Sequence, residues 1–322
     1  MTDTRAAANE TPSRGRARAG SRPRPIVTGG AGFVGSHLVD RLLAEGQDVL
    51  VLDDLSTGKA RNLATGARLE QVDIASDDLD RVFRAWRPTV VFHLAAQASV
   101  SISVREPLRD LAVNVVGTHR VGVAARESDA RRLVFVSSGG AIYGETVRPA
   151  TERTLPAPTS YYGIHKLAAE GHAEMAGIPY AIARPSNIYG PRQAAGLEGA
   201  VVASFIGQAA GGEPLMIHGD GSQTRDFIHV TDVVEALWRL SRSDVPSGTW
   251  NLAAGRSIAI AGLADIVEQA AGRRLGRATG PRRAGDVTHS AMSAGRLRGL
   301  GWRPSVGLAA GVKGLVRTDP GT

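Results

Sequence analysis

A tyrosine and a lysine four residues apart are the first candidates for chemistry in this chain of 322 residues. Tyr162 and Lys166 lie in the stretch YYGIHK, and a spacing of four places both side chains on one face of a helix. A free tyrosine has a pKa near ~10, so only about one molecule in a thousand is phenolate at neutral pH. A nearby ammonium favours the phenolate, which can then remove a proton from a hydroxyl group. Tyr161 is out of phase with Lys166, so we expect Tyr162 to be the base. The alternative is a buried tyrosine and a surface lysine that merely share a helix.

Three glycines spaced three apart predict a phosphate-binding turn. Gly29, Gly32 and Gly35 follow the apolar run PIVT and precede an amphipathic stretch. A strand that enters a helix through such a turn is typical of dinucleotide binding, with the pyrophosphate at the helix N-terminus. We expect Gly29 to permit the tight turn, Gly32 to let the pyrophosphate approach and Gly35 to let helix and strand pack closely. A flexible glycine-rich loop is the alternative.

An acidic residue about twenty positions after the turn favours NAD as the dinucleotide. Asp53 ends the next apolar run, where a carboxylate binds the adenosine ribose hydroxyls and repels the 2′-phosphate of NADP. The alternative is a helix cap or turn residue. A positive nicotinamide near Tyr162 would add to the effect of Lys166, and a shift of roughly 3 pKa units corresponds to about 4 kcal/mol.

Strands and helices that alternate along the chain must position these residues. Apolar runs predict strands at 25–28, 48–55, 67–74, 89–96, 132–138 and 179–185, with helices over roughly 32–46, 77–86, 106–127, 162–176 and 199–210. The order predicts an α/β fold with a doubly wound parallel Rossmann sheet. We expect an NAD-binding domain over 25–186, with returns near 230–255 such as TDVVEALWRL (231–240). We expect a smaller C-terminal α/β lobe, which would mainly hold the substrate, over 187–322.

Composition limits the partners and the location. The net charge is +7, but the first 24 residues hold six arginines against two acidic residues. We expect this basic tail, 1–24, to be disordered and solvated rather than to bind nucleic acid. There is no cysteine, no apolar run of membrane-spanning length and no secretory signal. We therefore expect a cytoplasmic protein with no membrane contact. The histidines have no metal-ligand spacing, so no metal is expected.

The motifs together resemble the extended short-chain dehydrogenase/reductase superfamily, in its branch of nucleotide-sugar epimerases and dehydratases. The resemblance covers nearly the whole chain after residue 24. It includes TGGAGFVGSHL, DDLSTG, FHLAAQ, NVVGT, YYGIHK, RPSNIYGPRQ, GDGSQTRDFIHVTD and RRAGD. The resemblance implies a cofactor site in which Asp73 and Ile74 flank the adenine. The cofactor residues it implies are Gly29, Gly32, Phe33, Val34, Gly35, Asp53, Asp54, Ser56, Thr57, Gly58, Asp73, Ile74, Leu94, Ala95, Ala96, Asn114, Ser137, Tyr162, Lys166 and Pro185.

The third catalytic residue departs from the family pattern. Relatives carry Ser or Thr four residues before the Tyr-Gly pair, here Tyr143-Gly144, and that position is Gly139. Ser138 stands one residue earlier. Either Ser138 reaches the substrate, or a water substitutes, or Tyr162 works more directly; we favour Ser138. A loop of the form GGAIYG resembles one subgroup of sugar-nucleotide 4-epimerases.

The same loop lacks the acids of related reactions. The 4,6-dehydratases place an Asp-Glu pair where this chain has Gly140 and Ala141, and the UDP-glucuronate decarboxylases place a Glu at Ala141. The resemblance therefore implies 4-epimerisation of a UDP-hexose of the UDP-glucose/UDP-galactose type through a 4-keto sugar. The alternatives are a UDP-glucuronate or UDP-N-acetylglucosamine 4-epimerase, a nucleotide-sugar 4-ketoreductase and a non-catalytic NAD-binding sensor.

The resemblance also implies the substrate residues and the assembly. Arg225 and Arg283 would clamp the diphosphate and Asp286 would bind the nucleoside ribose, the alternatives being surface ion pairs and a turn. Ser290, a small residue, would admit an N-acetyl group, and Arg192 is a possible partner for a uronate. The expected substrate residues are Gln97, Ser138, Gly139, Tyr162, Asn187, Arg192, Ala200, Val201, Arg225, Arg283, Asp286 and Ser290. Relatives are often dimers through a four-helix contact, so we expect a homodimer through the helices near 106–127 and 162–176.

Overall fold

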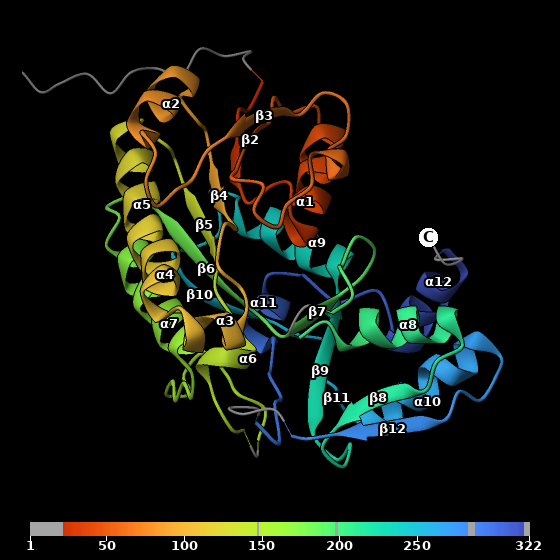
Figure 1. Cartoon of the computed structure of the whole chain (residues 1–322). Coiled ribbons are helices and arrows are strands. Elements are labelled where there is room, and N and C mark those ends of the chain that lie inside the picture. The colour runs from red at the N-terminus through yellow and green to blue at the C-terminus, as the bar shows by residue number, and fades with distance from the viewer. Residues whose placement is uncertain (1–21, 147, 197–198, 283–286, 319–322) are drawn as a thin grey trace, which may run out of the picture.

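A seven-stranded sheet forms the centre of the protein in the computed structural model, which describes residues 22–146, 148–196, 199–282 and 287–318. All neighbouring strands run parallel in the order β10-β6-β5-β4-β1-β2-β3, which confirms the predicted doubly wound fold (Figure 1). The strands are β1 (Ile26–Thr28), β2 (Leu50–Asp53), β3 (Arg68–Gln71), β4 (Val91–His93), β5 (Leu133–Val136), β6 (Tyr180–Pro185) and β10 (Gly248–Leu252). The inner strands are mostly apolar towards both faces because helices cover both, whereas the edge strand β3 carries Arg68, Glu70 and Gln71.

Two groups of helices cover the two faces of this sheet (Figure 1). One face carries α2 (Leu79–Trp86), α4 (Pro107–Leu111), α5 (Gly117–Glu127) and α7 (Tyr161–Glu174), and the other carries α1 (Phe33–Ala44) and α9 (Val230–Leu240). Phe83, Val121 and Phe135 belong to the core under the first group, and Leu38 and Leu237 belong to the core under the second. Each face of the sheet therefore has its own hydrophobic core.

The helix predicted over 106–127 is interrupted in the structure. Pro107 starts α4, a π-helical stretch η2 (Ala112–Val116) follows it, and only then does α5 begin. The sequence analysis also missed α3 (Val100–Arg105), which begins where the Ser99 side chain accepts a hydrogen bond from the Ile102 amide. π-Helical stretches are often found at functional sites, and this one contains Asn114.

The elements after β6 build a second group with a separate core. Small sheets are formed by β7 (Asn187–Tyr189), β9 (Thr224–His229) and β11 (Ser257–Ala259), and by β8 (Leu215–His218) and β12 (Arg277–Gly280). Helices α8 (Val201–Gly211), α10 (Ile260–Ala271) and α12 (Leu308–Thr318) pack beside them, around Phe205 and Leu263. The chain leaves this group twice, because α9 packs on α1 and β10 extends the main sheet beside β6. The boundary at 186/187 stays a prediction.

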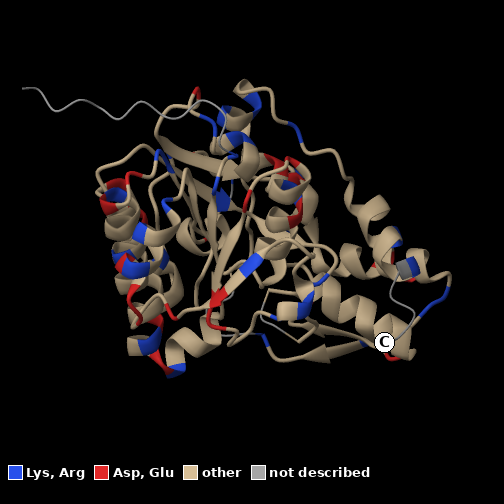
Figure 2. Ribbon diagram, turned by 90° about the horizontal axis from the view of Figure 1, so that it is seen from above, with Lys and Arg blue, Asp and Glu red and all other residues tan. Residues whose placement is uncertain are grey.

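The smaller elements complete the described chain. They are η1 (Ala60–Asn62), α6 (Gly139–Ile142) and α11 (Gly295–Gly299). Acidic and basic residues, red and blue on the ribbon of Figure 2, alternate along the outer helices. Among the described residues, no helix is both long and apolar enough to cross a membrane.

Candidate active site

The glycine turn lies at the carboxyl edge of the sheet, where β1 stands between β2 and β4. Gly29 has φ +68°, and a Cβ there would lie 2.6 Å from the Ala95 nitrogen. A Cβ on Gly35 would lie 2.1 Å from the Gly29 oxygen, and Gly32 caps the N-terminus of α1. Because no side chain fits at Gly29 or Gly35, the turn forms a bare backbone cradle at a helix N-terminus, beside the loop that leaves β4. Such a cradle fits a pyrophosphate.

Asp53 lies at the end of β2 and faces this turn. Its carboxylate is 6% exposed and accepts hydrogen bonds from the amides of Ala31 and Leu55, each at 2.9 Å. Burial raises the pKa of Asp53, and the two amides oppose that shift. A Cβ on Gly58 would lie 2.5 Å from the same carboxylate, so the loop after β2 closes over it. Asp53 is thus a turn residue that also stands where a ribose would bind.

Asp73 and Ile74, the two residues expected to flank the adenine, have different surroundings. Asp73 accepts hydrogen bonds from the Ala75 amide and the Ser76 hydroxyl at the end of β3. Ile74 is 3% exposed, and its side chain packs where a Cβ of Gly117 would lie 2.7 Å away. The side chain of Ile74 is therefore part of the core under α5, and the contact of Ile74 with the adenine stays a prediction.

The other expected cofactor residues gather at the same edge, because the strands are parallel. Ser137, directly after β5, is 4% exposed, and its hydroxyl finds no hydrogen-bond partner among the described residues. An orphaned hydroxyl there fits a bound group that supplies the partner. Phe33 and Val34 open α1, and Pro185 ends β6. The remaining residues lie in loops at this edge, namely Asp54, Ser56, Thr57, Leu94, Ala95 and Ala96. Together with the glycine cradle, these residues fit a dinucleotide.

Tyr162, Lys166 and Ser138 come together at the amino end of α7. The Ser160 side chain caps that helix by accepting from the Gly163 amide at 3.1 Å. A Cβ on Gly163 would lie 2.5 Å from the Ala141 oxygen, so only glycine lets α7 approach the loop after β5 this closely. The approach brings the Tyr162 hydroxyl into hydrogen-bond contact with Ser138.

Lys166 is 2% exposed and is held below the tyrosine. Its Nζ donates to the Val136 oxygen at 2.7 Å and lies 4.4 Å from the centre of the Phe135 ring. Burial lowers the pKa of Lys166 to about 8, although Glu170 and Asp110 oppose the shift.

The pKa of Tyr162 is raised in the protein alone. Burial raises it to about 12; the hydrogen bond with Ser138 lowers it and the charge of Asp110 raises it. In the protein alone, desolvation outweighs the single hydroxyl that stabilises the phenolate. The acidic phenol was predicted with a positive nicotinamide beside it, and it stays a prediction for the NAD-bound protein. A cation bound next to the phenol would be needed to reverse the shift.

Gly139 is a glycine because another side chain fills the space beside it. A Cβ there would lie 2.2 Å from Cε and 2.4 Å from Sδ of Met292, which is 2% exposed. The Ser or Thr that relatives carry at this position is therefore replaced by packing with Met292. The sequence analysis missed Met292, since nothing in its local sequence connects it to the loop after β5.

A buried ion pair one turn beyond Lys166 was also missed. Arg184 of β6 donates to Glu170 from Nε at 2.8 Å and from Nη2 at 2.5 Å, and both side chains are 7% exposed. Arg184 Nη1 donates to the Tyr143 hydroxyl, which donates to Asn251 of β10, each at 2.8 Å. This network fixes α7 against the main sheet.

Two expected ligand contacts are used inside the chain instead. Asn114 is 1% exposed; its oxygen accepts from the Gln97 amide at 3.1 Å, and its amide donates to the Gln97 oxygen at 2.9 Å. The Gln97 side chain donates to Asp110 and to the Ser99 oxygen. Asn114 as a cofactor contact and Gln97 as a substrate contact are therefore corrected: both hold the loop after β4.

A cleft of about 380 Å³ lies between the sheet edge and the second group of elements. Ser138, Tyr162, Asn187, Val201, Arg225 and Ser290 from the expected substrate set line it. Its other walls include the small residues Gly140 and Ala141 and the larger Phe205, Met216 and Ile260.

Other expected substrate residues lie elsewhere. Ala200 is buried just before α8, and Gly139 is buried beside Met292. Arg192 pairs with Asp40 of α1, with Nη2 at 2.8 Å, and does not line the cleft, so its contact with a uronate stays a prediction that this geometry does not support. Arg283 and Asp286 lie outside the described residues.

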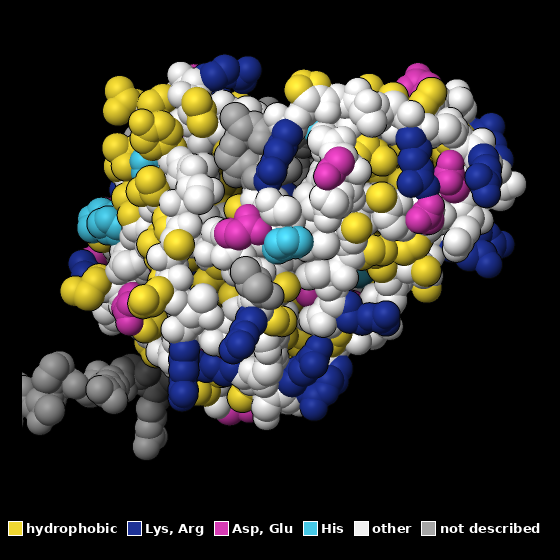
Figure 3. All heavy atoms as spheres, turned by 90° about the horizontal axis from the view of Figure 1, so that it is seen from below, with side chains coloured by type: hydrophobic (Ala, Val, Ile, Leu, Met, Phe, Trp, Pro, Cys, Tyr) yellow, Lys and Arg dark blue, Asp and Glu magenta, His cyan; other side chains and the backbone are white. Residues whose placement is uncertain are grey.

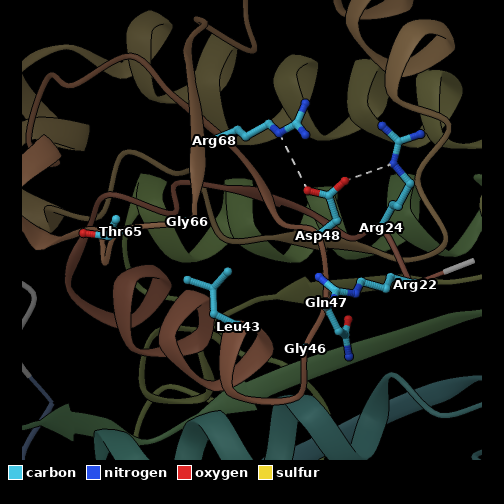
Figure 4. A pocket seen from close by; sticks show the side chains of 9 residues that line it. All are labelled: Arg22, Arg24, Leu43, Gly46, Gln47, Asp48, Thr65, Gly66 and Arg68. Carbon is cyan, nitrogen blue, oxygen red and sulfur yellow. Dashed lines mark ion pairs between the residues drawn. The ribbon is translucent and has the colours of Figure 1, made fainter.

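A second cavity, of about 620 Å³, opens near the amino ends of β2 and β3 (Figure 4). Arg24 and Arg68 approach Asp48 there from two sides, at 3.6 and 3.7 Å. It contains none of the expected site residues. In the described part of the chain, no three His, Asp or Glu side chains are grouped so that they could hold a metal ion.

Known proteins that resemble this chain in sequence and structure show the family to which it belongs. A family model described as the NAD dependent epimerase/dehydratase family matches residues 26–253. The UDP-glucose 4-epimerase of Mycolicibacterium smegmatis is 40% identical over 300 residues, which are 90% of this chain and 96% of that protein. A solved UDP-glucose 4-epimerase of Thermotoga maritima with UDP-glucose is 39% identical, with a TM-score of 0.88 over 91% of this chain and 97% of that one. The Thermus thermophilus UDP-glucose 4-epimerase complex with NAD is 38% identical, with the same TM-score over 93% and 99%.

Proposed function

Because the chain belongs to the NAD dependent epimerase/dehydratase family, we propose that it is an isomerase that inverts C4 of a UDP-hexose of the UDP-glucose/UDP-galactose type. The observation that carries the proposal is the contact between Tyr162 and Ser138 in the wall of the cleft, with Lys166 beneath. Gly140 and Ala141 line the same wall, and neither offers the carboxyl group that elimination or decarboxylation would need.

The residues of this chain would manage the proton at the sugar hydroxyl. Bound NAD supplies the acceptor and donor of the hydride at C4. Tyr162 Oη takes the proton of the 4-hydroxyl as the 4-keto sugar forms, and returns it to O4 after the hydride comes back on the opposite face. Ser138 stabilises the phenolate through its hydrogen bond, and the Lys166 ammonium lies one helical turn away. Asp53, the glycine cradle and Ser137 would hold the dinucleotide.

The cleft is lined on the side of the main sheet by small residues and on the side of the second group by larger ones, which supports epimerisation. Ser138, Gly140 and Ala141 leave room near Tyr162 for a sugar ring to turn over. Phe205 and Ile260 offer apolar surface for a nucleoside, and Arg225 offers a guanidinium for the diphosphate. A firmly held nucleotide with a loosely held hexose is what inversion at C4 requires.

Ser290 supports a second substrate of the same reaction. Its side chain is small, 5% exposed and part of the cleft wall, so we include UDP-N-acetylhexosamines among the substrates. A UDP-uronate has less support, because Arg192 is paired with Asp40.

Incubation with UDP-glucose, UDP-galactose, UDP-N-acetylglucosamine and UDP-glucuronate, followed by NMR of the products, tests the proposal. We expect interconversion of UDP-glucose and UDP-galactose without added NAD and with no net NADH. A dehydrated or decarboxylated product would contradict it. Stoichiometric consumption of added NADH would identify a ketoreductase, and bound NAD without any turnover would favour a sensor.

An exposed apolar surface supports a homodimer. Val104, Leu108, Leu111 and Val116 from α3 to η2, with Tyr161 and Ile164 from α7, are between 37% and 78% exposed. Figure 3 shows hydrophobic side chains gathered along one side of the molecule. We propose that these helices pack against the same helices of a second copy, because a contiguous apolar surface of this kind is rarely left in water.

Light scattering during gel filtration tests the dimer. The double variant Leu108→Glu/Ile164→Glu should elute as a monomer, and Lys313→Glu on α12 should leave the dimer intact. A wild-type monomer at micromolar concentration would contradict the proposal. Location in the cytoplasm stays a prediction.

A further inference from the structure

A buried carboxylate that the proposed mechanism does not use lies behind the catalytic helix. Asp110 is 0% exposed and receives three side-chain hydrogen bonds. Gln97 Nε2 donates to Oδ1 at 2.5 Å, Asn114 Nδ2 donates to Oδ1 at 3.1 Å, and His165 Nδ1 lies 2.5 Å from Oδ2. A fully buried carboxylate is costly unless a partner compensates its charge, so His165 is the group to consider.

His165 belongs to the helix that carries the base. It follows Tyr162 by three residues on α7 and immediately precedes Lys166. Its side chain is 12% exposed, and its ring stacks on Tyr161 with centroids 6.1 Å apart. Asp110 therefore links α7 to Gln97, in the loop whose residue Ala95 touches the glycine turn. A single carboxylate connects the base to the loop at the cofactor cradle.

The charge of Asp110 acts on both reacting side chains. It raises the pKa of Tyr162, which opposes the phenolate, and it raises the pKa of Lys166, which favours the ammonium. Glu170 on α7 acts on Lys166 in the same direction.

Two other titratable side chains near Asp110 and the reacting residues do not compensate the negative charge of Asp110. Arg109 of α4 is exposed and is paired with Glu106 at 3.1 Å. His93 on β4 is neutral, because burial and then the charge of Lys166 lower its pKa to about 3. Among the described residues, His165 lies within ion-pair distance of Asp110, with Nδ1 2.5 Å from Oδ2, and it compensates the carboxylate when it is protonated.

We propose that His165 and Asp110 are positioning residues for Tyr162, in which an imidazolium at His165 offsets the buried carboxylate and lets the phenol ionise. The pair also fixes the loop after β4 against α7. Without the imidazolium, the carboxylate would oppose the phenolate that the reaction needs. This inference rests on the proposed epimerisation for its activity readout only.

His165→Asn tests the proposal in the full-length, NAD-loaded protein with UDP-galactose as substrate. The amide keeps a donor near the position of Nδ1 but cannot carry a charge. We expect the acidic limb of the kcat profile to move up by about one pH unit, a tenfold loss of kcat on the acidic side. KM should change by less than about twofold, since neither residue lines the cleft.

Two further variants make the test specific. Asp110→Asn should move the acidic limb the other way, and the double variant should return it close to the wild-type position, because it lacks both the carboxylate and the charge that offsets it. His172→Asn is the matched control, since His172 is exposed on the same helix and contacts His119 rather than Asp110. If Asp110→Asn does not fold, the comparison of His165→Asn with His172→Asn still tests the proposal.

The outcomes separate this proposal from the proposed function. An equal loss of kcat at every pH in His165→Asn, or a double variant whose acidic limb stays at the His165→Asn position, would overturn the positioning role. Failure of the wild type to convert any UDP-sugar would overturn the proposed function instead. The Tyr162 phenolate can then be followed by ultraviolet absorbance, as the difference from Tyr162→Phe in NAD-loaded protein. It should form at higher pH in His165→Asn, and an unchanged titration would overturn the role of His165.

Discussion

Replacing Gly139 with serine should destabilise the protein, although relatives carry a hydroxyl residue there. The new Cβ would lie 2.2 Å from Cε and 2.4 Å from Sδ of Met292, and 3.2 Å from the Pro185 oxygen. Met292 is 2% exposed within the main core, so its end can move only by disturbing packed neighbours. Overpacking of this kind costs about 1–2 kcal/mol.

The same geometry predicts compensation by a second substitution. Met292→Ala alone should cost about 2–3 kcal/mol through the cavity it leaves. In the double variant Gly139→Ser/Met292→Ala, the serine occupies space that the methionine end has vacated. The cost should then be about 2 kcal/mol, which is at least ~1 kcal/mol less than the sum of the single variants.

Urea unfolding followed by circular dichroism measures these differences through the unfolding midpoint. Gly140→Ser is the matched control, because a Cβ there would meet only the Asn187 amide oxygen, at 3.9 Å. It should change stability by less than about 0.5 kcal/mol. Equal costs for the two serine variants, or strict additivity in the double variant, would refute the view that Met292 excludes a side chain at position 139.

Three further predictions concern the site. Tyr162→Phe should abolish turnover and retain NAD. Ser138→Ala should lower kcat about 10–100-fold, because it removes the hydrogen bond that stabilises the phenolate. Steady-state kinetics measures turnover in both variants, and mass spectrometry measures the bound NAD. Gly35→Ala should lose NAD binding and stability, because its Cβ would lie 2.1 Å from a backbone oxygen. Gly299→Ala is the control and should keep both, because its Cβ would have nothing within 4 Å. Thermal unfolding with and without NAD measures the stability and the cofactor binding of each variant. The pKa of Lys166 is lowered from 10.5 to about 8, so between these values the unfolded chain holds a proton that the folded chain has lost. The stability of cofactor-free protein should therefore rise with pH across this window by up to about 3 kcal/mol relative to Lys166→Met, and urea titrations that show no such rise would contradict the assignment.

The family resemblance and the parallel sheet could be predicted because both depend on local patterns. Strands buried on both faces are apolar throughout, and the glycine turn carries its meaning in its spacing. The match over residues 26–253 confirms the family, and the strand order confirms the fold. Tyr162, Lys166 and Ser138 were recognised for the same reason, since one helix and one loop contain them.

The contacts that decide the details come from distant parts of the chain. Asn114 and Gln97 are the residue types that bind ligands, but Asp110 and Ser99 compete for the same amide groups inside the protein. The sequence offers no measure of desolvation, so the rise that burial causes in the pKa of Tyr162 in the protein alone could not be predicted from it. Arg192 was assigned to substrate from its motif, whereas Asp40 on a helix far away in sequence takes its charge.

The return of β10 to the main sheet limits how this protein can be recombined with its relatives. β10 supplies the last strand beside β6, in a register from Gly248 with Ala181 to Leu252 with Pro185, and α9 shields α1. If the whole segment from 187 onwards were replaced by that of a relative, the main sheet would receive a foreign edge strand in place of β10. It would also receive a foreign helix in place of α9. A chimera that changes the sugar specificity must therefore splice around 230–252, or else leave β6 as an open edge prone to association.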